Sequence, residues 1–260
     1  MTVQHVLVTG ANRGIGAAIV HALAADGCRV TLAGRSIDAL EAVRASLPKV
    51  ADAEHQVVQM DVGNADSIAQ AFKDARAGAG RIHALVNNAG AITTGPTQRF
   101  PLSDWQNMLD VNLTGVFLCC QAAIDDLRKA RMDGHSGRIV NIASTAAQKG
   151  YPFTAAYAAA KHGVVGLTRS LALEVASIGV AVNSVCPGYT DTDIIRDGMA
   201  KIMEKTGKSE EDALKNFTQS NPMLRLVKVE EVAEVVRWLC RQAPVTITGQ
   251  SISISGGEVM

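Results

Sequence analysis

Three residues in the middle of the chain have the types and the spacing for proton transfer at a carbonyl oxygen. Tyr157 and Lys161 are four residues apart, so on a helix they share one face. An isolated phenol has a pKa near about 10 and is a reluctant base, but an ammonium one helical turn away favours the phenolate and lowers that pKa. Ser144, at the end of an apolar run, can hydrogen-bond the same oxygen. The set predicts acid–base chemistry on a ketone or an alcohol.

A fourth polar residue, Asn112, lies inside a segment of helical periodicity and is a candidate for binding a water molecule that links Lys161 to solvent. Each of the four residues has an ordinary structural explanation when taken singly. A Tyr and a Lys at this spacing can be a solvent-facing pair, Ser144 can cap a strand end, and a lone amide most often satisfies its neighbours. The catalytic interpretation therefore depends on the rest of the chain.

A glycine-rich segment near the start of the sequence has the pattern of a phosphate-binding loop. Residues 10–16 read Gly-Ala-Asn-Arg-Gly-Ile-Gly, between an apolar run at 5–8 and a helical run at 17–25. Residues without a Cβ let the backbone approach closely, and a helix N-terminus offers free N–H groups and a positive dipole end to a pyrophosphate. In this strand-to-helix context the pattern predicts a dinucleotide site. Its candidate residues are Gly10, Asn12, Arg13, Gly14, Ile15 and Gly16.

Two arginines bear on which dinucleotide is bound. NAD-specific proteins commonly place an acid after the second strand to bind the ribose 2′-hydroxyl, but this chain has Gly34, Arg35 and Ser36 there. Arg35 and Arg13 could pair a 2′-phosphate through charge-assisted hydrogen bonds, whereas NAD(H) would leave both guanidinium groups without a partner. Either arginine alone could be a solvated surface residue. The combination favours NADP(H), with NAD(H) as the alternative.

The elements that must position these residues follow a strand–helix alternation. Short β-branched runs occur at 5–8, 29–33, 56–60, 83–87, 138–142, 180–185 and 251–255, with amphipathic segments following them. Runs that are apolar on both faces are typical of strands buried in a parallel sheet. The sequence therefore predicts an α/β fold of the Rossmann type. We expect a doubly wound, seven-stranded parallel sheet with helices on both faces, in a single domain.

Three longer segments complete this picture. Residues 103–130 begin with Ser103 and Gln106 at capping-box spacing and predict one long helix. Residues 154–177 are rich in Ala and Gly and predict a second helix that packs closely on another surface. Residues 190–228 are polar and weakly periodic around Gly198 and Gly207, so we expect a mobile lid of short helices over the substrate.

Composition excludes several classes of partner. Lys plus Arg and Asp plus Glu are equal at 25 each, so no global field favours nucleic acid or an anionic membrane. We find neither a signal peptide nor an apolar run long enough to span a bilayer. Five cysteines without a C-x-x-C pair indicate a reducing compartment, and the six scattered histidines give no metal-ligand spacing. A cytoplasmic protein without a metal site is expected.

These motifs, in this order, resemble the short-chain dehydrogenase/reductase family over essentially the whole chain. The resemblance implies that Asp61 and Val62 lie at the adenine and that Asn88, Ala89 and Gly90 lie on the adenosine side. It implies that Tyr157 and Lys161 border the cofactor, with Lys161 holding the nicotinamide ribose. In the oxidised complex, the positive charge of the nicotinamide ring would then join the Lys161 ammonium in favouring the Tyr157 phenolate. It further implies that Pro187, Gly188, Thr190 and Thr192 receive the nicotinamide and the phosphates. A homotetramer or homodimer would use the two long helices and the sheet edge near 249–257.

Within the family, residues 137–144 and 161–168 are similar to 3-oxoacyl-thioester and polyketide ketoreductases and to 3-hydroxybutyrate dehydrogenases. The leading hypothesis is an NADPH-dependent reductase of a 3-oxoacyl thioester or a similar small-molecule ketone. The alternative is an NAD-dependent dehydrogenase of a hydroxyacyl or hydroxy-acid substrate. A dinucleotide-binding sensor without turnover is disfavoured, because Asn112, Ser144, Tyr157 and Lys161 are all present.

Overall fold

The computed structural model describes residues 3–50 and 53–260, and a seven-stranded sheet forms its centre. All the strand pairs are parallel, and the spatial order is β3-β2-β1-β4-β5-β6-β7. The strands are β1 His5–Thr9, β2 Arg29–Gly34, β3 Gln56–Gln59, β4 Ala84–Asn87, β5 Gly137–Ile142, β6 Val180–Pro187 and β7 Ser251–Ile254. The predicted fold and all seven predicted strands are confirmed, with small shifts at their ends.

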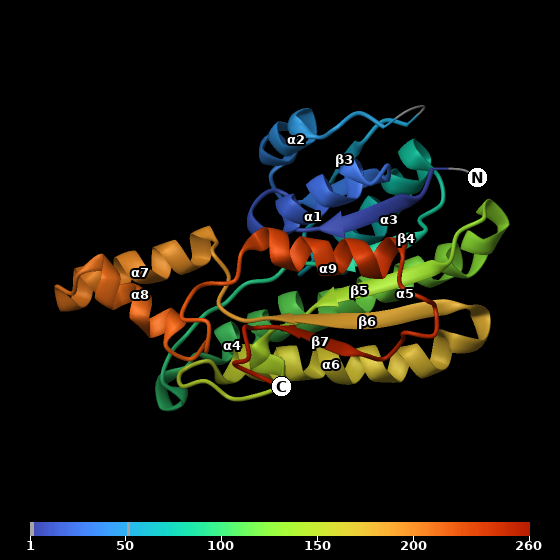
Figure 1. Cartoon of the computed structure of the whole chain (residues 1–260). Coiled ribbons are helices and arrows are strands. Elements are labelled where there is room, and N and C mark those ends of the chain that lie inside the picture. Colours follow the sequence, from blue (N-terminus) through green and yellow to red (C-terminus); the bar gives the residue numbers. More distant parts are fainter. Residues whose placement is uncertain (1–2, 51–52) are drawn as a thin grey trace.

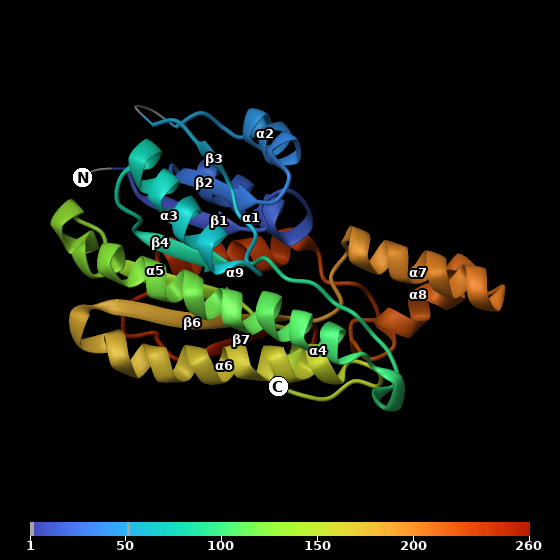
Figure 2. The same ribbon diagram turned by 180° about the vertical axis from the view of Figure 1, so that it is seen from behind.

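Helices cover both faces of the sheet, as the two opposite views in Figure 1 and Figure 2 show. One face carries α1 Gly14–Ala25, α2 Ile37–Ser46 and α9 Val229–Arg241. The other carries α3 Ala65–Ala79, α5 Gly115–Lys129 and α6 Ala155–Val175. Each side has its own apolar core, and the central strands β1 and β6 are buried along their whole length. Burial on both faces explains why these strands lack the alternation of a half-exposed strand.

Helix α3 illustrates how the sequence sets these elements. Its residues Ile68, Phe72 and Ala75 recur at helical spacing and are buried against the sheet. Asn64 caps its start, because the side chain accepts a hydrogen bond from the N–H of Ser67 at 3.0 Å. Gly80 ends it at φ 76°, a conformation that favours glycine.

The predicted long helix after residue 103 is present but contains an irregularity. It runs as α4 Leu102–Leu109, a π turn at Asp110–Thr114, and α5. The capping-box prediction is wrong: Pro101 occupies the N-cap position, and the Gln106 side chain donates to Asp110 Oδ1 at 2.9 Å instead. The position before the first helical turn tolerates a proline, because proline has no N–H that would be left unpaired there.

The helical stretch Leu102–Asp133 is long and apolar enough, by length and composition, to cross a membrane, which differs from the sequence expectation. Its buried residues, however, belong to the core on one face of the sheet, and Cys119, Ala123 and Leu127 are among them. The apolar character of these buried residues reflects packing against β4, β5 and α3, and 39% of the apolar window is buried in this way.

Residues 190–228 form two helices, α7 Asp193–Thr206 and α8 Glu210–Thr218, which project beyond the sheet at the edge where the strands end (Figure 1). Ser209 caps α8 by accepting from the N–H of Asp212 at 3.2 Å. The short helices predicted for this region are thus present. Their closing over a substrate stays a prediction.

Candidate active site

A cavity of about 680 Å³ opens at the edge of the sheet where the parallel strands end. Loops after β1, β2, β3, β4, β5 and β6 all contribute to its wall, as the crevice rule for open parallel sheets predicts. Every residue that the sequence analysis proposed for the site lines this one cavity. They are Gly10, Asn12, Arg13, Gly14, Ile15, Gly16, Arg35, Asp61, Val62, Asn88, Ala89, Gly90, Asn112, Ser144, Tyr157, Lys161, Pro187, Gly188, Thr190 and Thr192.

The glycine loop has a geometry that side chains would block. Gly10 and Gly14 have φ values of 65° and 53°, in the left-handed region. A Cβ on Gly16 would collide with the carbonyl oxygen of Gly10 and would stand 2.5 Å from the Asn88 amide nitrogen. That nitrogen donates to the carbonyls of Thr9 and Gly10, both at 3.0 Å. Asn88 therefore fixes the loop from the neighbouring strand β4.

The two arginines lie at the glycine-loop end of the cavity. Both side chains are exposed, and Arg13 stands 3.8 Å from Asp193 Oδ2 at the start of α7. In the described part of the chain, no side chain pairs with the Arg35 guanidinium. An exposed guanidinium at the rim is free to meet an anionic ligand.

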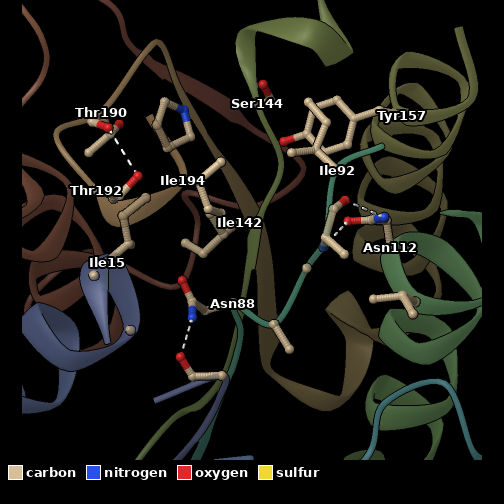
Figure 3. Close-up of a pocket in the computed structure, with 18 of the residues that line it drawn as sticks. Ile15, Asn88, Ile92, Asn112, Ile142, Ser144, Tyr157, Thr190, Thr192 and Ile194 are labelled. Atoms are coloured by element: carbon tan, nitrogen blue, oxygen red, sulfur yellow. Dashed lines mark hydrogen bonds between the residues drawn. The ribbon is translucent and has the colours of Figure 1, made fainter. Parts of the chain in front are cut away.

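Asn112 lies in the π turn and is fully buried. Its amide group donates to the carbonyl of Ala91 at 2.9 Å and accepts from the N–H of Ala91 at 3.2 Å (Figure 3). This pair ties the loop after β4 to the helix. The same amide nitrogen also donates to the carbonyl of Met108 at 3.0 Å, and the water-binding role expected for Asn112 stays a prediction. Gly90 is needed here because a Cβ would stand 2.9 Å from Asn112 Oδ1.

Ser144, Tyr157 and Lys161 meet at the inner end of the cavity, and Figure 3 shows the tyrosine hydroxyl directed toward the serine. Ser144 Oγ accepts from the N–H of Ala146 at 3.1 Å, which leaves its own proton to be donated. Lys161 Nζ donates to the carbonyl of Ile142 at 2.8 Å and lies 5.7 Å from the centre of the Tyr157 ring. The prediction that Tyr157 and Lys161 share one face of a helix is confirmed.

Burial dominates the electrostatics of this group. It raises the pKa of Tyr157, and the hydrogen bond with Ser144 offsets only part of the effect. It lowers the pKa of Lys161 to about 8. The lowered Tyr157 pKa expected from the Lys161 ammonium together with an oxidised nicotinamide ring concerns the cofactor-bound enzyme and stays a prediction; in the protein alone, burial has the larger effect on this pKa.

A buried hydrogen-bond chain fixes helix α6 relative to the sheet. The Asn87 amide of β4 donates to Asn141 Oδ1 of β5 at 2.9 Å, and Asn141 donates to Thr168 Oγ1 of α6 at 2.9 Å. All three residues are less than 3% exposed. Because Tyr157 and Lys161 lie on the same helix, this chain holds their distance from Ser144 constant.

Several residues of the cavity were missed by sequence reasoning. They form an apolar and aromatic wall near Ser144 and Tyr157, and they are Ile92, Tyr151, Tyr189, Ile194 and Ile195. Ile92, Tyr151 and Tyr189 lie in loops, where single residues carry no periodic signal. Ile194 and Ile195 lie in α7, inside the predicted lid segment, but its weak periodicity did not single them out.

The chain belongs to the short-chain dehydrogenase family, whose model matches residues 4–202. Over 263 aligned residues it is 41% identical to a 3-oxoacyl-[acyl-carrier-protein] reductase of Synechocystis sp., with 100% of this chain and 98% of that protein covered. It is 34% identical to a D-beta-hydroxybutyrate dehydrogenase of Rhizobium meliloti, with 96% of both chains covered. It is therefore an NAD(P)-dependent oxidoreductase of this family.

Solved structures agree with this assignment. The crystal structure of an actinorhodin polyketide ketoreductase variant with NADPH has a TM-score of 0.88 and 33% identity, with 98% of this chain and 97% of that chain covered. The predicted similarity to acyl and polyketide ketoreductases and to hydroxybutyrate dehydrogenases is confirmed.

Proposed function

We propose that this enzyme uses NADPH to reduce a ketone, with a 3-oxoacyl thioester or a similar carbonyl compound as substrate. The observation that carries the proposal is the meeting of Ser144, Tyr157 and Lys161 at the inner end of a glycine-lined cavity. The relatives that act on oxoacyl and polyketide carbonyls support a ketone substrate.

The loop residues fit a dinucleotide. Gly16 and Gly90 stand where a Cβ would collide with the cavity wall, and Gly14 begins helix α1 with free N–H groups directed at the cavity. Asp61, Val62 and Ala89 would border the adenosine, and Pro187, Gly188, Thr190 and Thr192 the nicotinamide and phosphates. When bound, the cofactor supplies the hydride that reaches the carbonyl carbon.

The protein's own residues orient the substrate and move the proton. Ser144 donates its hydroxyl proton to the carbonyl oxygen, because a ketone oxygen can only accept and the N–H of Ala146 holds Ser144 Oγ in place without using that proton. Tyr157 gives its proton to the same oxygen as negative charge develops there. A phenol whose pKa burial has raised is protonated at neutral pH, so it is suited to act as the acid in reduction. The Lys161 ammonium stabilises the phenolate that remains.

The preference for NADPH is supported by Arg35 and Ser36 standing directly after β2 in place of an acid, and by the unpaired guanidinium of Arg35 at the cavity rim. A structural neighbour was solved with NADPH. NAD-dependent oxidation of a hydroxy acid is the second candidate, and the D-beta-hydroxybutyrate dehydrogenase among the relatives favours it.

The test is a panel of acetoacetyl-CoA, a small β-keto ester, a cyclic ketone and a sugar, each assayed with NADPH and with NADH. We expect NADPH-dependent turnover of the first two. The Tyr157→Phe variant should lose at least about a hundredfold in kcat while binding NADPH with unchanged affinity, measured by fluorescence titration. An active Phe variant would rule the mechanism out.

We also infer that the enzyme works in the cytoplasm as a homotetramer or homodimer. Its five cysteines are free and buried, in keeping with a reducing compartment. Phe117 of α5 and Leu173 of α6 are 46% and 82% exposed, and such apolar residues on the two long helices support contacts between copies.

A further inference from the structure

A buried carboxylate lies directly behind the substrate end of the cavity. The Glu258 side chain is 1% exposed, and its Oε1 atom stands 2.9 Å from Lys149 Nζ. The same oxygen accepts a hydrogen bond from the Tyr151 hydroxyl at 2.7 Å. Burying a carboxylate is costly unless it is paired, so these two partners account for its presence there.

The backbone brings Glu258 to this place by a turn after strand β7. Gly256 and Gly257 have φ values of 62° and 92°, and the N–H of Glu258 donates to the carbonyl of Ser255 at 3.2 Å. Gly188 leaves room for the carboxylate, because a Cβ at that position would stand 3.1 Å from Glu258 Oε2. The carboxylate is thus seated between the loop after β5 and the loop after β6.

Glu258 determines how the Tyr151 ring faces the cavity. The Tyr151 hydroxyl has one proton, which goes to Glu258, and it accepts the proton of Thr145 Oγ1 at 2.7 Å. With both ends of the hydroxyl occupied, the ring stands edge-on to Tyr189 at 5.9 Å between ring centres. Tyr189 in turn packs edge-on against Phe217 of α8 at 5.2 Å. The substrate end therefore has an aromatic wall that continues into the lid helices.

The cation directly behind this wall, Lys149, already has a counter-ion. Among the described residues that line the cavity, the cationic side chains are Arg13, Arg35 and Lys161, and the two arginines belong to the glycine-loop end. Lys149 lies behind the wall, 4.9 Å from the centre of the Tyr151 ring, but its ammonium is paired with Glu258. Burial raises the pKa of the Glu258 carboxyl, yet hydrogen bonds from Tyr151 and Lys149 outweigh burial, so the group stays ionised at neutral pH.

We propose that Glu258 is a positioning residue that makes the enzyme select uncharged ketones over free oxo acids. By pairing with Lys149 and holding Tyr151, it presents the substrate with an aromatic wall that adds no free cation to the Lys161 ammonium already present, so a substrate carboxylate finds no counter-ion in the wall. This inference rests on the proposed function and narrows it, since it favours thioesters and esters and disfavours the hydroxy-acid alternative.

The experiment compares two substrates that share a β-keto group and differ in charge, methyl acetoacetate and acetoacetate, with loss of NADPH absorbance as the readout. The wild-type enzyme should have a kcat/KM at least about tenfold higher for the ester. Glu258→Gln frees the Lys149 ammonium behind Tyr151, so the ratio should shift toward acetoacetate by about tenfold. The double variant K149M/E258Q removes both charges and should restore the wild-type ratio.

The ratio of the two substrates separates this role from a merely structural one, because partial misfolding lowers both values together. A wild-type enzyme that reduces acetoacetate as well as the ester would overturn the inference without any variant, and so would an unchanged ratio in a folded Glu258→Gln protein. Absence of ketone reduction by the wild-type enzyme with either cofactor would instead overturn the proposed function, and the inference with it.

Discussion

The residues proposed for proton transfer, Tyr157 and Lys161, show what their spacing in the sequence can and cannot predict. The four-residue spacing of Tyr157 and Lys161 correctly places both side chains on one face of α6 and in one cavity. The spacing does not give the direction of the pKa shift, because burial depends on what covers the phenol and the ammonium. Here burial raises the pKa of Tyr157 and lowers that of Lys161 to about 8. The spacing thus predicts that the two side chains lie together, which the cavity confirms, whereas their roles in proton transfer stay a prediction.

Arg35 gives a prediction about cofactor choice at the same scale. Replacing it with Asp should lower the NADPH to NADH ratio of kcat/KM by at least about tenfold. The reason is that a charge-assisted hydrogen bond to the 2′-phosphate is exchanged for repulsion and for an acceptor of the 2′-hydroxyl. Steady-state kinetics with both cofactors would measure it. Arg44→Asp, in helix α2 nearby but outside the cavity, is the control and should leave the ratio unchanged.

Elements were predicted well where periodicity is strong. Apolar runs at regular spacing predicted all seven strands and the two long helices, and the structure confirms them. The π turn at Asp110–Thr114 was not predictable, because the residues around Asn112 also fit a regular helix. The aromatic wall was missed for a related reason: Tyr151 and Tyr189 lie in loops, and Glu258 reaches them through a turn that only the folded chain brings close.

The contact between the glycine loop and helix α1 leads to a prediction for Gly16. An alanine there would press its Cβ against the Gly10 carbonyl, so we expect a loss of about 1–3 kcal/mol in the free energy of unfolding and weaker NADPH binding. Denaturant titration and fluorescence titration would measure the two effects. Gly166→Ala is the matched control, since its added Cβ meets nothing within 4 Å on α6. Equal behaviour of the two variants would contradict the assignment of Gly16 as a contact glycine.

At the scale of the whole molecule, the parallel topology separates two ends of the sheet. One end carries the cavity, and the other carries a buried histidine pair that sequence reasoning set aside as scattered residues. The N–H of His5 donates to His83 Nδ1 at 2.9 Å, and His83 Nε2 stands 3.0 Å from Asp133 Oδ2. Protonating His83 at Nδ1 would place two N–H donors opposite each other, so it would break the hydrogen bond from the N–H of His5.

This pair predicts a loss of stability in acid. Burial lowers the pKa of His5 from 6.5 to about 4, so the unfolded chain binds the proton more readily than the folded one. The contribution of His5 to stability is full above pH 6.5, falls by about 3 kcal/mol as the pH drops from 6.5 to about 4, and levels off below that. Denaturant titrations across this range would measure the slope. His5→Gln should flatten it, whereas His162→Gln, on the exposed side of α6, should not.

The π turn also sets the rotation of one helical segment against the next. Each extra residue in a helix rotates the segment before it by about 100° relative to the segment after it. Helix α4 can therefore pack against α6 while α5, in the same continuous helical stretch, packs against β4, β5 and α3. Deleting a single residue between 110 and 114 should rotate Met108 out of its buried position and break the hydrogen bonds between Asn112 and Ala91. The π turn thus sets the rotation of α4 relative to α5, so the number of residues in this helical stretch is as constrained as their identity.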